Sequence, residues 1–378
     1  MNIGIIGLPK AGKTTIFNAL TGQEAEVAEY TSARVEPNVA VVDVGDLRVD
    51  ELSRRYKPRK TIYATIEFID FVGGGTGSLG GSGVGGESAG GAGGAKESEG
   101  GIFSGEGITM IRNSDALLIV LRNFSNPTVD AVYGAPAPEG ELDTIETELI
   151  LSDQVIAERR LERIRSDHQR GKKTAASQAE EKVMQRLVEQ LEGGGAVRDL
   201  ELTAEEQQMT SGFRFLTAKQ ALLVLNSSED NYGQNAELLE RLEARYPVIE
   251  FAGNFEMELS RMEPEDAEAF MQDIGITESA RNRLTRFAYR MLGYISFFTV
   301  GEDEVRAWTI REGENAQQAA GTIHTDLAKG FIRAECFTYD DLVSAGSEAA
   351  VKQKGLFRLE GRDYRVQDGD ILNIRFNV

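Results

Sequence analysis

Residues 1–15 read MNIGIIGLPKAGKTT, a short apolar strand that runs directly into the phosphate-binding motif G-x-x-x-x-G-K-T. Its glycines allow successive backbone N–H groups to turn inward on phosphates. The ammonium of Lys13 can then reach the outer phosphates, and the hydroxyl of Thr14 can bind Mg²⁺. Residues 16–20 read as a helix, whose N-terminal dipole adds to the anion site. This context separates the motif from a chance glycine turn, and we expect a nucleotide triphosphate to contact Gly7, Lys10, Ala11, Gly12, Lys13, Thr14 and Thr15.

The composition is that of an acidic globular protein. The chain has 378 residues, of which 41% are hydrophobic and 27% are charged, and its formal net charge is −20. This length allows two or three domains. The negative charge argues against general affinity for nucleic acid or for anionic membranes, so any such contact requires a local basic patch.

Cysteine, histidine and apolar runs narrow the class of protein further. Cys336 is the only cysteine, which excludes an internal disulfide framework and fits a reducing cytosol. His168 and His324 are the only histidines, which excludes a histidine-rich metal site. No apolar run approaches about 18 residues, and we expect no signal peptide because the strand follows Met1 directly. We therefore expect a cytoplasmic protein without a membrane contact.

Strands alternate with helical patterns from Met1 to about Val132, as expected for a parallel sheet covered on both faces. Apolar strands are predicted at 39–44, 65–70 and 116–121, and the last is a continuous apolar run typical of a strand buried on both sides. The same pattern returns at 221–226. The sequence therefore predicts an α/β nucleotide-binding domain formed by residues 1–138 and 201–294.

Two segments interrupt this pattern. Residues 73–107 contain 17 of the 41 glycines, with Ser, Ala and Glu filling most other positions, so we expect a flexible loop. Residues 139–192 have apolar side chains at spacings of three, four and seven, and a polar break at 169–173 divides them. Two antiparallel helices that form an arm over residues 139–200 are the simplest solution. Thr203 to Glu206 read as a capping box that starts a further helix.

The pattern of apolar and polar residues changes again after a charged helix predicted at 278–292. Alternating, half-exposed strands are predicted at 296–300, 305–310, 332–337 and 371–376, and a helix is predicted at 316–327 among them. Residues 295–378 are therefore expected to form a small mixed α+β domain.

Three further elements narrow the nucleotide site. Asp70 and Gly73 close a strand as D-x-x-G, which places a carboxylate for Mg²⁺ and a glycine amide near the γ-phosphate. The alternative is a solvated carboxylate at the end of a strand. Residues 30–38 follow the first helix, where switch proteins carry a loop that senses the γ-phosphate. Residues 226–229, Asn-Ser-Ser-Glu, end the later buried strand, where base recognition normally lies. Together these elements favour a nucleotide switch.

The base element departs from the guanine-reading sequence N-K-x-D. Glu229 carries its carboxylate one methylene further out than the aspartate that accepts two hydrogen bonds from guanine. Ser227 cannot supply the aliphatic stem that a lysine lays over the base. Asn226 could serve either purine. We therefore expect ATP to be preferred, with GTP left open.

The chain resembles the YchF subfamily of Obg-like ATPases over almost its whole length. The resemblance is densest near the C-terminus and rests on residues 7–21, 35–39, 64–70, 226–229, 304–310, 318–326, 329–335, 364–370 and 375–378. It implies a P-loop G domain with an inserted antiparallel helical arm and a C-terminal TGS domain of ubiquitin-like (β-grasp) topology. It also implies an ATP-preferring, ribosome-associated protein.

The chain departs from this family at positions linked to hydrolysis. The threonine that the family places to reach Mg²⁺ is Arg34 here, so Thr31 or Ser32 would have to substitute. The histidine proposed to assist hydrolysis corresponds to Ile119, and the glycine-rich insertion replaces the segment after D-x-x-G. We therefore expect nucleotide binding, slow hydrolysis without an assigned catalytic residue, and Mg²⁺ held by Thr14, Asp70 and Thr31.

A basic cluster lies at the predicted tip of the arm. Residues 159–173 hold seven basic and two acidic side chains on a chain of net charge −20. They form either a solvated, ion-paired helix face or a contact for ribosomal RNA phosphates. With the resemblance, we expect a monomer whose partner is the ribosome or ribosomal RNA, bound through the TGS domain or through Arg159, Arg160, Arg163, Lys172 and Lys173.

Two functions of different class remain open, and a third is less favoured. The first is a slow ATPase switch that cycles on the ribosome. The second is a nucleotide-dependent binding module with little or no turnover, in which ATP sets a conformation. The third is a GTPase.

Overall fold

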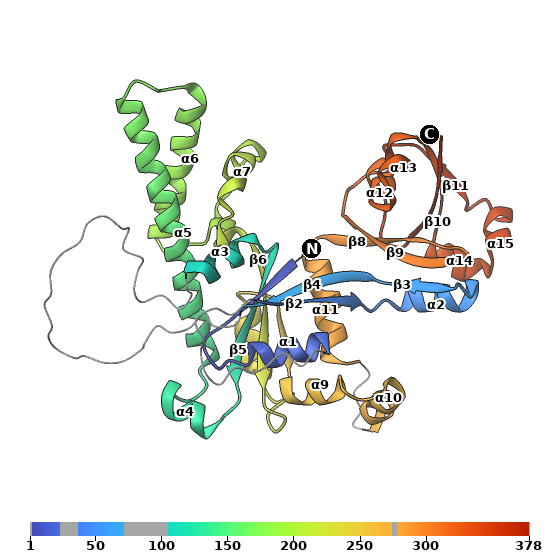
Figure 1. Ribbon diagram of the computed structural model, residues 1–378, viewed down its shortest axis with the longest axis horizontal. Coiled ribbons are helices and arrows are strands. Elements are labelled where there is room, and N and C mark those ends of the chain that lie inside the picture. Colours follow the sequence, from blue (N-terminus) through green and yellow to red (C-terminus); the bar gives the residue numbers. More distant parts are fainter. Residues whose placement is uncertain (1, 23–36, 72–104, 274–277, 378) are drawn as a thin grey trace, which may run out of the picture. The chain divides into compact units, whose positions relative to one another are not determined.

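The computed structural model describes residues 2–22, 37–71, 105–273 and 278–377 (Figure 1). The chain forms two compact units, one of Met1–Ala40 and Phe68–Glu268 and the other of Val41–Glu67 and Ala269–Val378. Thr31, Ser32 and Arg34 lie outside the described residues, as does the predicted glycine-rich loop except for residues 105–107, which begin helix α3. The domain boundaries expected from the sequence stay predictions.

A six-stranded sheet in the order β2-β4-β1-β5-β6-β7 lies mostly in the first unit, although residues 41–44 of β2 and 64–67 of β4 are counted with the second. Its strands are β1 (Asn2–Ile6), β2 (Asn38–Val44), β4 (Ala64–Asp70), β5 (Ala116–Asn123), β6 (Gln220–Ser227) and β7 (Val248–Phe251). β1, β5, β6 and β7 run parallel, with Leu118 beside both Ile5 and Leu222. β5 and β6 are buried almost from end to end, which explains their continuous apolar sequence. The predicted parallel α/β fold is confirmed.

Several helices lie between and after these strands along the chain. They are α1 (Lys13–Thr21), α3 (Gly105–Asn113), α4 (Pro127–Tyr133), α7 (Ala204–Thr210), α8 (Ala236–Glu243), α9 (Gly253–Leu259) and α10 (Pro264–Asp273), with 3₁₀ turns η1 (Val197–Asp199), η2 (Ser211–Phe213) and η3 (Leu216–Ala218). Leu117 and Leu121 of β5 pack with Leu142 at the start of α5 (Pro138–Gln169). The predicted capping box opens α7, where Thr203 and Glu206 exchange hydrogen bonds. None of the described helices is long and apolar enough to span a membrane.

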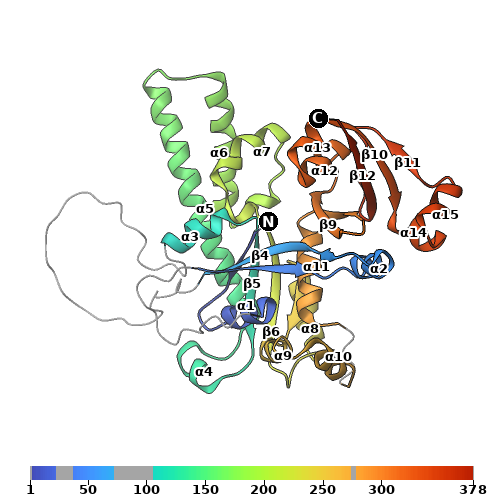
Figure 2. The same ribbon diagram turned by 45° about the vertical axis from the view of Figure 1, so that its right-hand side comes forward.

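α5 and α6 (Ala175–Glu192) lie side by side as an antiparallel pair (Figure 2). Between them they bury an apolar cluster that includes Leu161 and Ile164 of α5 and Val183 and Leu187 of α6. The structure thus contains the two helices that the apolar spacings predict, and the polar break at 169–173 is the turn between them.

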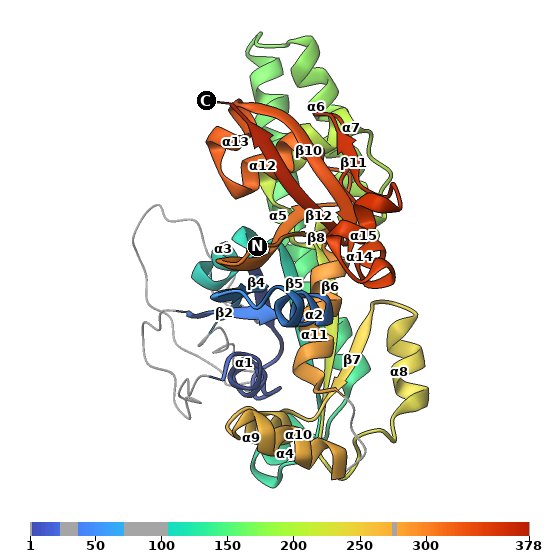
Figure 3. The same ribbon diagram turned by 90° about the vertical axis from the view of Figure 1, so that its right-hand side faces the viewer.

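The second unit has a second sheet, in the order β11-β10-β12-β8-β9-β3. Figure 3 labels β8, β10, β11 and β12 of this sheet. Its strands are β3 (Lys60–Ile62), β8 (Tyr294–Thr299), β9 (Glu304–Arg311), β10 (Phe331–Thr338), β11 (Arg358–Glu360) and β12 (Asp370–Phe376), and its helices are α2 (Leu47–Tyr56), α11 (Ala280–Met291), α12 (Ala316–Ile323), α13 (Thr325–Lys329), α14 (Tyr339–Ala345) and α15 (Glu348–Gln353). β8 and β12 are parallel and their outer neighbours are antiparallel to them. Ala316 and Ala320 of α12 pack against Phe297 and Leu372 of this sheet.

One strand of the second sheet comes from a distant part of the chain. β3 runs parallel to β9, with Lys60 beside Glu304 and Ile62 beside Arg306. Sequence reasoning missed β3 because three residues, two of them exposed, carry no readable periodicity.

Candidate nucleotide-binding site

The loop between β1 and α1 has room for only glycine at two positions. A Cβ on Gly7 would stand 2.5 Å from the carbonyl oxygen of Val120, and a Cβ on Gly12 would stand 2.2 Å from Nδ2 of Asn226. Gly12 also has a left-handed φ of 93° immediately before α1. The loop therefore keeps a bare backbone beside a helix N-terminus, where the helix dipole favours an anion.

Lys13 opens α1 with its ammonium held inside the loop. Its Nζ donates hydrogen bonds to the carbonyl oxygens of Gly7 and Leu8, each at 3.0 Å. Burial lowers the pKa of Lys13 to about 8, although the nearby carboxylates of Asp70 and Glu141 oppose this shift. The loop thus holds a partly desolvated cation that a phosphate oxygen can neutralise.

The other predicted loop residues take different places. Lys10 is exposed and has a left-handed φ of 64°. Ala11 is buried, and its N–H lies 3.3 Å from the carbonyl oxygen of Leu8. Thr15 is half-buried in the first turn of α1. The N–H and carbonyl groups of Ala11 are thus already engaged in holding the loop, through Leu8 and Asn226.

Asp70 ends β4 with a completely buried carboxylate beside Thr14. Thr14 Oγ1 donates a hydrogen bond to Asp70 Oδ2 at 2.9 Å, and Asn38 Nδ2 lies 3.4 Å from the same oxygen. Burial raises the pKa of Asp70, while the hydrogen bond from Thr14 and the charge of Lys13 oppose the rise. Asp70 Oδ1 has no hydrogen-bond partner among the described residues.

These oxygens suit a Mg²⁺ ion. Mg²⁺ prefers oxygen ligands and commonly takes one or two from the protein, with phosphates and water completing the shell. A cation here would compensate the charge that Oδ1 of Asp70 leaves unpaired. The fold brings Thr14 and Asp70 together, whereas the third predicted ligand, Thr31, lies outside the described residues. Asn38 lies in the segment 30–38 that the sequence places near the γ-phosphate, but its own side chain was given no role there, and its contact with Asp70 was missed.

Asn226 connects the phosphate loop to α9. Its Nδ2 donates to the carbonyl oxygen of Ala11 at 3.0 Å, and its Oδ1 accepts from the N–H of Gly253 at 3.2 Å. An amide nitrogen has two hydrogens, and the second hydrogen of Asn226 Nδ2 has no acceptor among residues 2–22, 37–71, 105–273 and 278–377. The residue expected at the base thus also holds the loop expected at the phosphates.

Ser227 and Glu229 lie in contrasting surroundings. Ser227 is buried; its hydroxyl donates to Glu250 Oε1 at 2.7 Å and accepts from Asn123 Nδ2 at 2.9 Å. Glu229 is exposed in the turn that follows β6. The hydroxyl of Ser227 is therefore used within the protein, whereas the side chain of Glu229 forms no hydrogen bond or ion pair with the part of the chain that the structure describes. Asn123 and Glu250 belong to no motif, and sequence reasoning missed both.

Ile119 is completely buried in the middle of β5. It lies beside Ile6 and Leu223 in the neighbouring strands and belongs to the apolar core. The position linked by resemblance to hydrolysis thus contributes no polar atom to the site.

Comparison with known proteins places this geometry in a family. Residues 2–150 match a family model described as 50S ribosome-binding GTPase, and residues 294–377 match the YchF-GTPase C-terminal family, described as a protein of unknown function (DUF933). A curated relative from Pasteurella multocida (strain Pm70), named ribosome-binding ATPase YchF, is 37% identical and is matched over 99% of both chains. The chain belongs to the YchF family.

Other YchF proteins give the same result. A curated YchF from Bacillus subtilis (strain 168), also named a ribosome-binding ATPase, is 36% identical over 100% of both chains. The solved structure of the Schizosaccharomyces pombe YchF GTPase matches 99% of this chain and 97% of its own with a TM-score of 0.80 and 28% identity. The resemblance drawn from the motifs is confirmed along the full length.

The arm of this YchF protein contains two kinds of basic side chain. Arg160 reaches across to α6, where Nε and Nη2 donate to both carboxylate oxygens of Glu180 at 2.7 Å each. Arg165 likewise contacts Glu181 and Gln185. In contrast, five basic residues are exposed and form no ion pair with a described residue: Arg159, Arg163, Arg170, Lys172 and Lys173.

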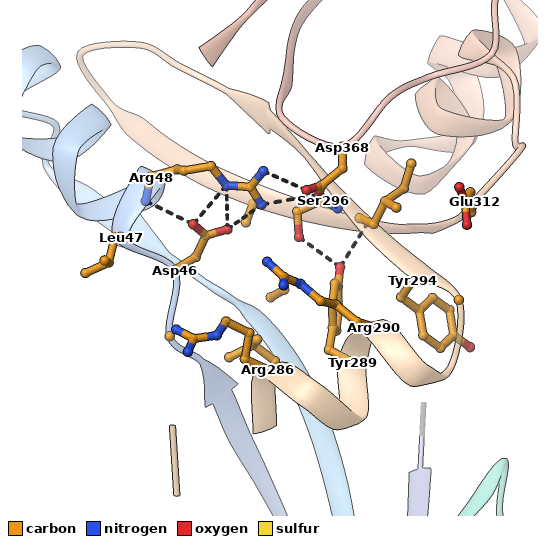
Figure 4. A pocket seen from close by; sticks show the side chains of 16 residues that line it. Asp46, Leu47, Arg48, Arg286, Tyr289, Arg290, Tyr294, Ser296, Glu312 and Asp368 are labelled. Carbon is orange, nitrogen blue, oxygen red and sulfur yellow. Dashed lines mark hydrogen bonds and ion pairs between the residues drawn. The ribbon is translucent and has the colours of Figure 1, made fainter. Parts of the chain in front are cut away.

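The second unit of this YchF protein contains a pocket of about 560 Å³ between α11, β8 and the start of α2 (Figure 4). Arg48 lies along one side, where it donates to Asp46 and to Asp368, each at 2.8 Å in the closest contact. The Tyr289 hydroxyl is hydrogen-bonded to Ser296 Oγ at 2.9 Å. Many polar side chains that line the pocket are thus hydrogen-bonded to each other. These hydrogen bonds connect α2 and α11 to the second sheet.

Proposed function

We propose that this YchF protein is a Mg²⁺-dependent nucleotide-binding switch that prefers ATP to GTP, hydrolyses it slowly and associates with the ribosome. The observation that carries the proposal is the pairing of Thr14 with the buried Asp70, beside the desolvated ammonium of Lys13. Three features of a triphosphate–metal site, namely a bare loop, a cation and a carboxylate, meet there. The names of the curated relatives, ribosome-binding ATPases, agree with this proposal.

The proposed nucleotide contacts follow from this arrangement. Backbone groups from Gly7 to Gly12, with the side chains of Lys13, Thr14 and Thr15, would hold the phosphates. Thr14 and Asp70 would hold Mg²⁺, and we keep Thr31 as a proposed third ligand from the sequence. The bound cation would supply positive charge where the phosphate oxygens gather. Asn226, Ser227 and Glu229 would border the base.

The proposed preference for ATP rests on the residues that would border the base. The free Nδ2 hydrogen of Asn226 suits N7, which is an acceptor in both purines, so it does not discriminate between them. Glu229 is longer than the aspartate of guanine-reading sites, and no lysine stem is present to cover the base. A GTPase is the second candidate, because the Schizosaccharomyces pombe YchF and the N-terminal family model are both described as GTPases.

Slow hydrolysis is proposed because the core residue Ile119 can neither position nor deprotonate a water. Turnover well below the enzyme median of about 10 s⁻¹ is expected for the isolated protein. A binding module without turnover is the neighbouring alternative. A rate above that median without any partner would exclude both.

We also propose that the ribosome is bound through the arm or the C-terminal domain. The five exposed cations at 159–173 suit RNA phosphates, because an acidic chain otherwise repels nucleic acid. The sequence divisions at 139–200 for the arm and 295–378 for a TGS domain are part of this proposal.

Calorimetry with Mg²⁺ and ATP tests the nucleotide site directly. Lys13→Ala should abolish measurable binding, because it removes the cation held inside the loop. Lys182→Ala, an exposed lysine on α6, is the matched control and should bind like the unchanged protein. Equal affinity of Lys13→Ala and wild-type protein for ATP would show that the nucleotide binds elsewhere.

A further inference from the structure

Glu250 lies near the end of β7 and gathers three hydrogen-bond donors. Its Oε1 accepts from Ser227 Oγ at 2.7 Å and from Asn235 Nδ2 at 2.6 Å, and its Oε2 accepts from the N–H of Gly233 at 3.0 Å. These donors come from the end of β6, from the start of α8 and from the turn between them. A single carboxylate therefore ties together both ends of one turn.

This turn, residues 228–235, carries Glu229. Within it, the N–H groups of Asn231 and Tyr232 point at the carbonyl oxygen of Ser228, at 3.2 and 3.0 Å. Asn231 Nδ2 also donates to the backbone oxygen of Asn123 at 3.0 Å, which anchors the turn to the end of β5. Glu250 supplies the corresponding anchor on the β7 side.

The turn lies where α/β sheets commonly bind ligands. In open α/β sheets, ligands bind outside the carboxyl ends of parallel strands, and the turn follows the carboxyl end of β6. Asn226, one residue before Ser227, reaches the phosphate loop through Ala11. The phosphate end of the site is held by Asn226, and the turn at the base end is held by Glu250. The two ends therefore have separate supports.

We propose that Glu250 is a positioning residue for the nucleotide base. It holds the turn with Glu229 in the conformation that faces the base, and it leaves the phosphate contacts to the loop at residues 7–15. This inference rests on the proposed nucleotide site. It adds the residue through which the base contributes to the affinity for the nucleotide. A charged acceptor suits this task because hydrogen bonds to a carboxylate are stronger than those to a neutral group.

The alternative is a general structural contact. Loss of such a contact would weaken every ligand of the site equally, whereas loss of base positioning would weaken only ligands that carry a base. The difference can be measured with two competitors, Mg²⁺-ATP and the Mg²⁺ complex of ribose 5′-triphosphate, which lacks the base. The decisive quantity is the ratio of their two affinities.

The experiment uses the full chain with Glu250→Ala, Glu250→Gln and the control Glu237→Ala, an exposed glutamate on α8. Glu250→Ala should weaken ATP at least tenfold while ribose 5′-triphosphate stays within about twofold. Glu250→Gln should fall between, because one carboxamide oxygen can still accept from Ser227 while the NH₂ group faces the N–H of Gly233. Glu237→Ala should leave the ratio unchanged.

Each contrary result has a distinct reading. If Glu250→Ala leaves the ratio of the two affinities unchanged, either because both fall equally or because neither falls, the positioning role is overturned and the proposed function stays intact. A wild-type protein that binds neither ligand would overturn the proposed function itself. If Glu250→Ala does not fold, Asn235→Ala removes one of the same hydrogen bonds from the other side and must lower the ratio in the same direction.

Discussion

Arg112 Nη1 lies 2.7 Å from Oδ1 of Asp153, whose side chain is completely buried. The same carboxylate accepts hydrogen bonds from the backbone N–H groups of Leu216 and Thr217 and from the Thr217 hydroxyl, at 2.9, 2.8 and 2.8 Å. Arg112 also donates to the carbonyl oxygen and hydroxyl of Ser152. One ion pair therefore fastens α3, α5 and η3 to each other within the first unit.

Removing one member of this pair should destabilise the fold strongly. Arg112→Ala leaves a buried carboxylate without its counter-charge, and such a loss costs about 3–5 kcal/mol in the free energy of unfolding. Chemical denaturation of the full chain measures it. Arg159→Ala, an exposed arginine on α5, is the control and should change the free energy by no more than about 0.5 kcal/mol. Similar midpoints for both variants would mean that the buried pair does not contribute as its burial suggests.

ATP affinity should depend on pH through Lys13. Burial lowers the pKa of this ammonium to about 8 in the free protein, and bound phosphates would raise it again by favouring the charged form. Below pH 8 the lysine is already protonated, so affinity should be flat on its account. Above pH 8 binding must take up a proton, and affinity should fall by up to tenfold per pH unit.

Calorimetry between pH 7 and 9.5 in two buffers of different ionisation enthalpy measures this proton uptake. A constant affinity over the range, with no uptake, would show that Lys13 keeps an ordinary pKa or lies away from the phosphates.

Base preference should respond to the length of residue 229. Glu229→Asp shortens an exposed side chain in the turn after β6 and restores the carboxylate reach of guanine-reading sites. The ratio of GTP to ATP affinity should therefore rise. Ser227→Lys, which would add the lysine stem of guanine-reading sites, is unsuitable because Ser227 is buried and its hydroxyl donates to Glu250. The opposite exchange next door, Asp230→Glu, is the control; an equal effect of both would remove the argument for Glu229.

The parts of the fold that the sequence predicted are those with a strong local signal. β5 and β6 are continuous apolar runs buried on both faces, and the two arm helices repeat apolar residues every three or four positions. β3 lacked such a signal, because its pairing with β9 depends on residues about 240 positions apart and on three residues without periodicity. Long-range pairing of short strands is a tertiary effect that local pattern does not contain.

The candidate site shows the same division. Lys13, Thr14 and Asp70 were found because their motifs impose fixed spacings that the chemistry requires. Glu250 and Asn38 act through hydrogen bonds that exist only once distant segments meet. Glu250 belongs to no motif, and Asn38 lies in a segment that the sequence places near the γ-phosphate without giving its side chain a role. The arm adds a further case, since the sequence grouped Arg160 with the exposed cations while the structure pairs it with Glu180.

That pairing sharpens the test of ribosome association. Reversing the charge of Arg160 would break a bond between α5 and α6, so a loss of binding could reflect a damaged arm. The informative variant carries glutamate only at the exposed cations that form no ion pair with the described part of the chain, namely Arg159, Arg163, Arg170, Lys172 and Lys173.

This variant should co-sediment poorly with ribosomes and still bind ATP with wild-type affinity, because the changes lie on the arm and leave the phosphate loop untouched. Wild-type co-sedimentation should also fall steeply as salt rises, since each phosphate contact releases condensed counterions. Arg160→Gln is the matched control. It should lower the thermal stability of the protein, because the contact with Glu180 is lost, and leave the salt dependence of ribosome binding close to that of the wild-type protein. Full co-sedimentation of the charge-reversed arm, or binding that does not depend on salt, would place the ribosome contact on another surface, and the strands and helices from β8 to β12 would be the next to test.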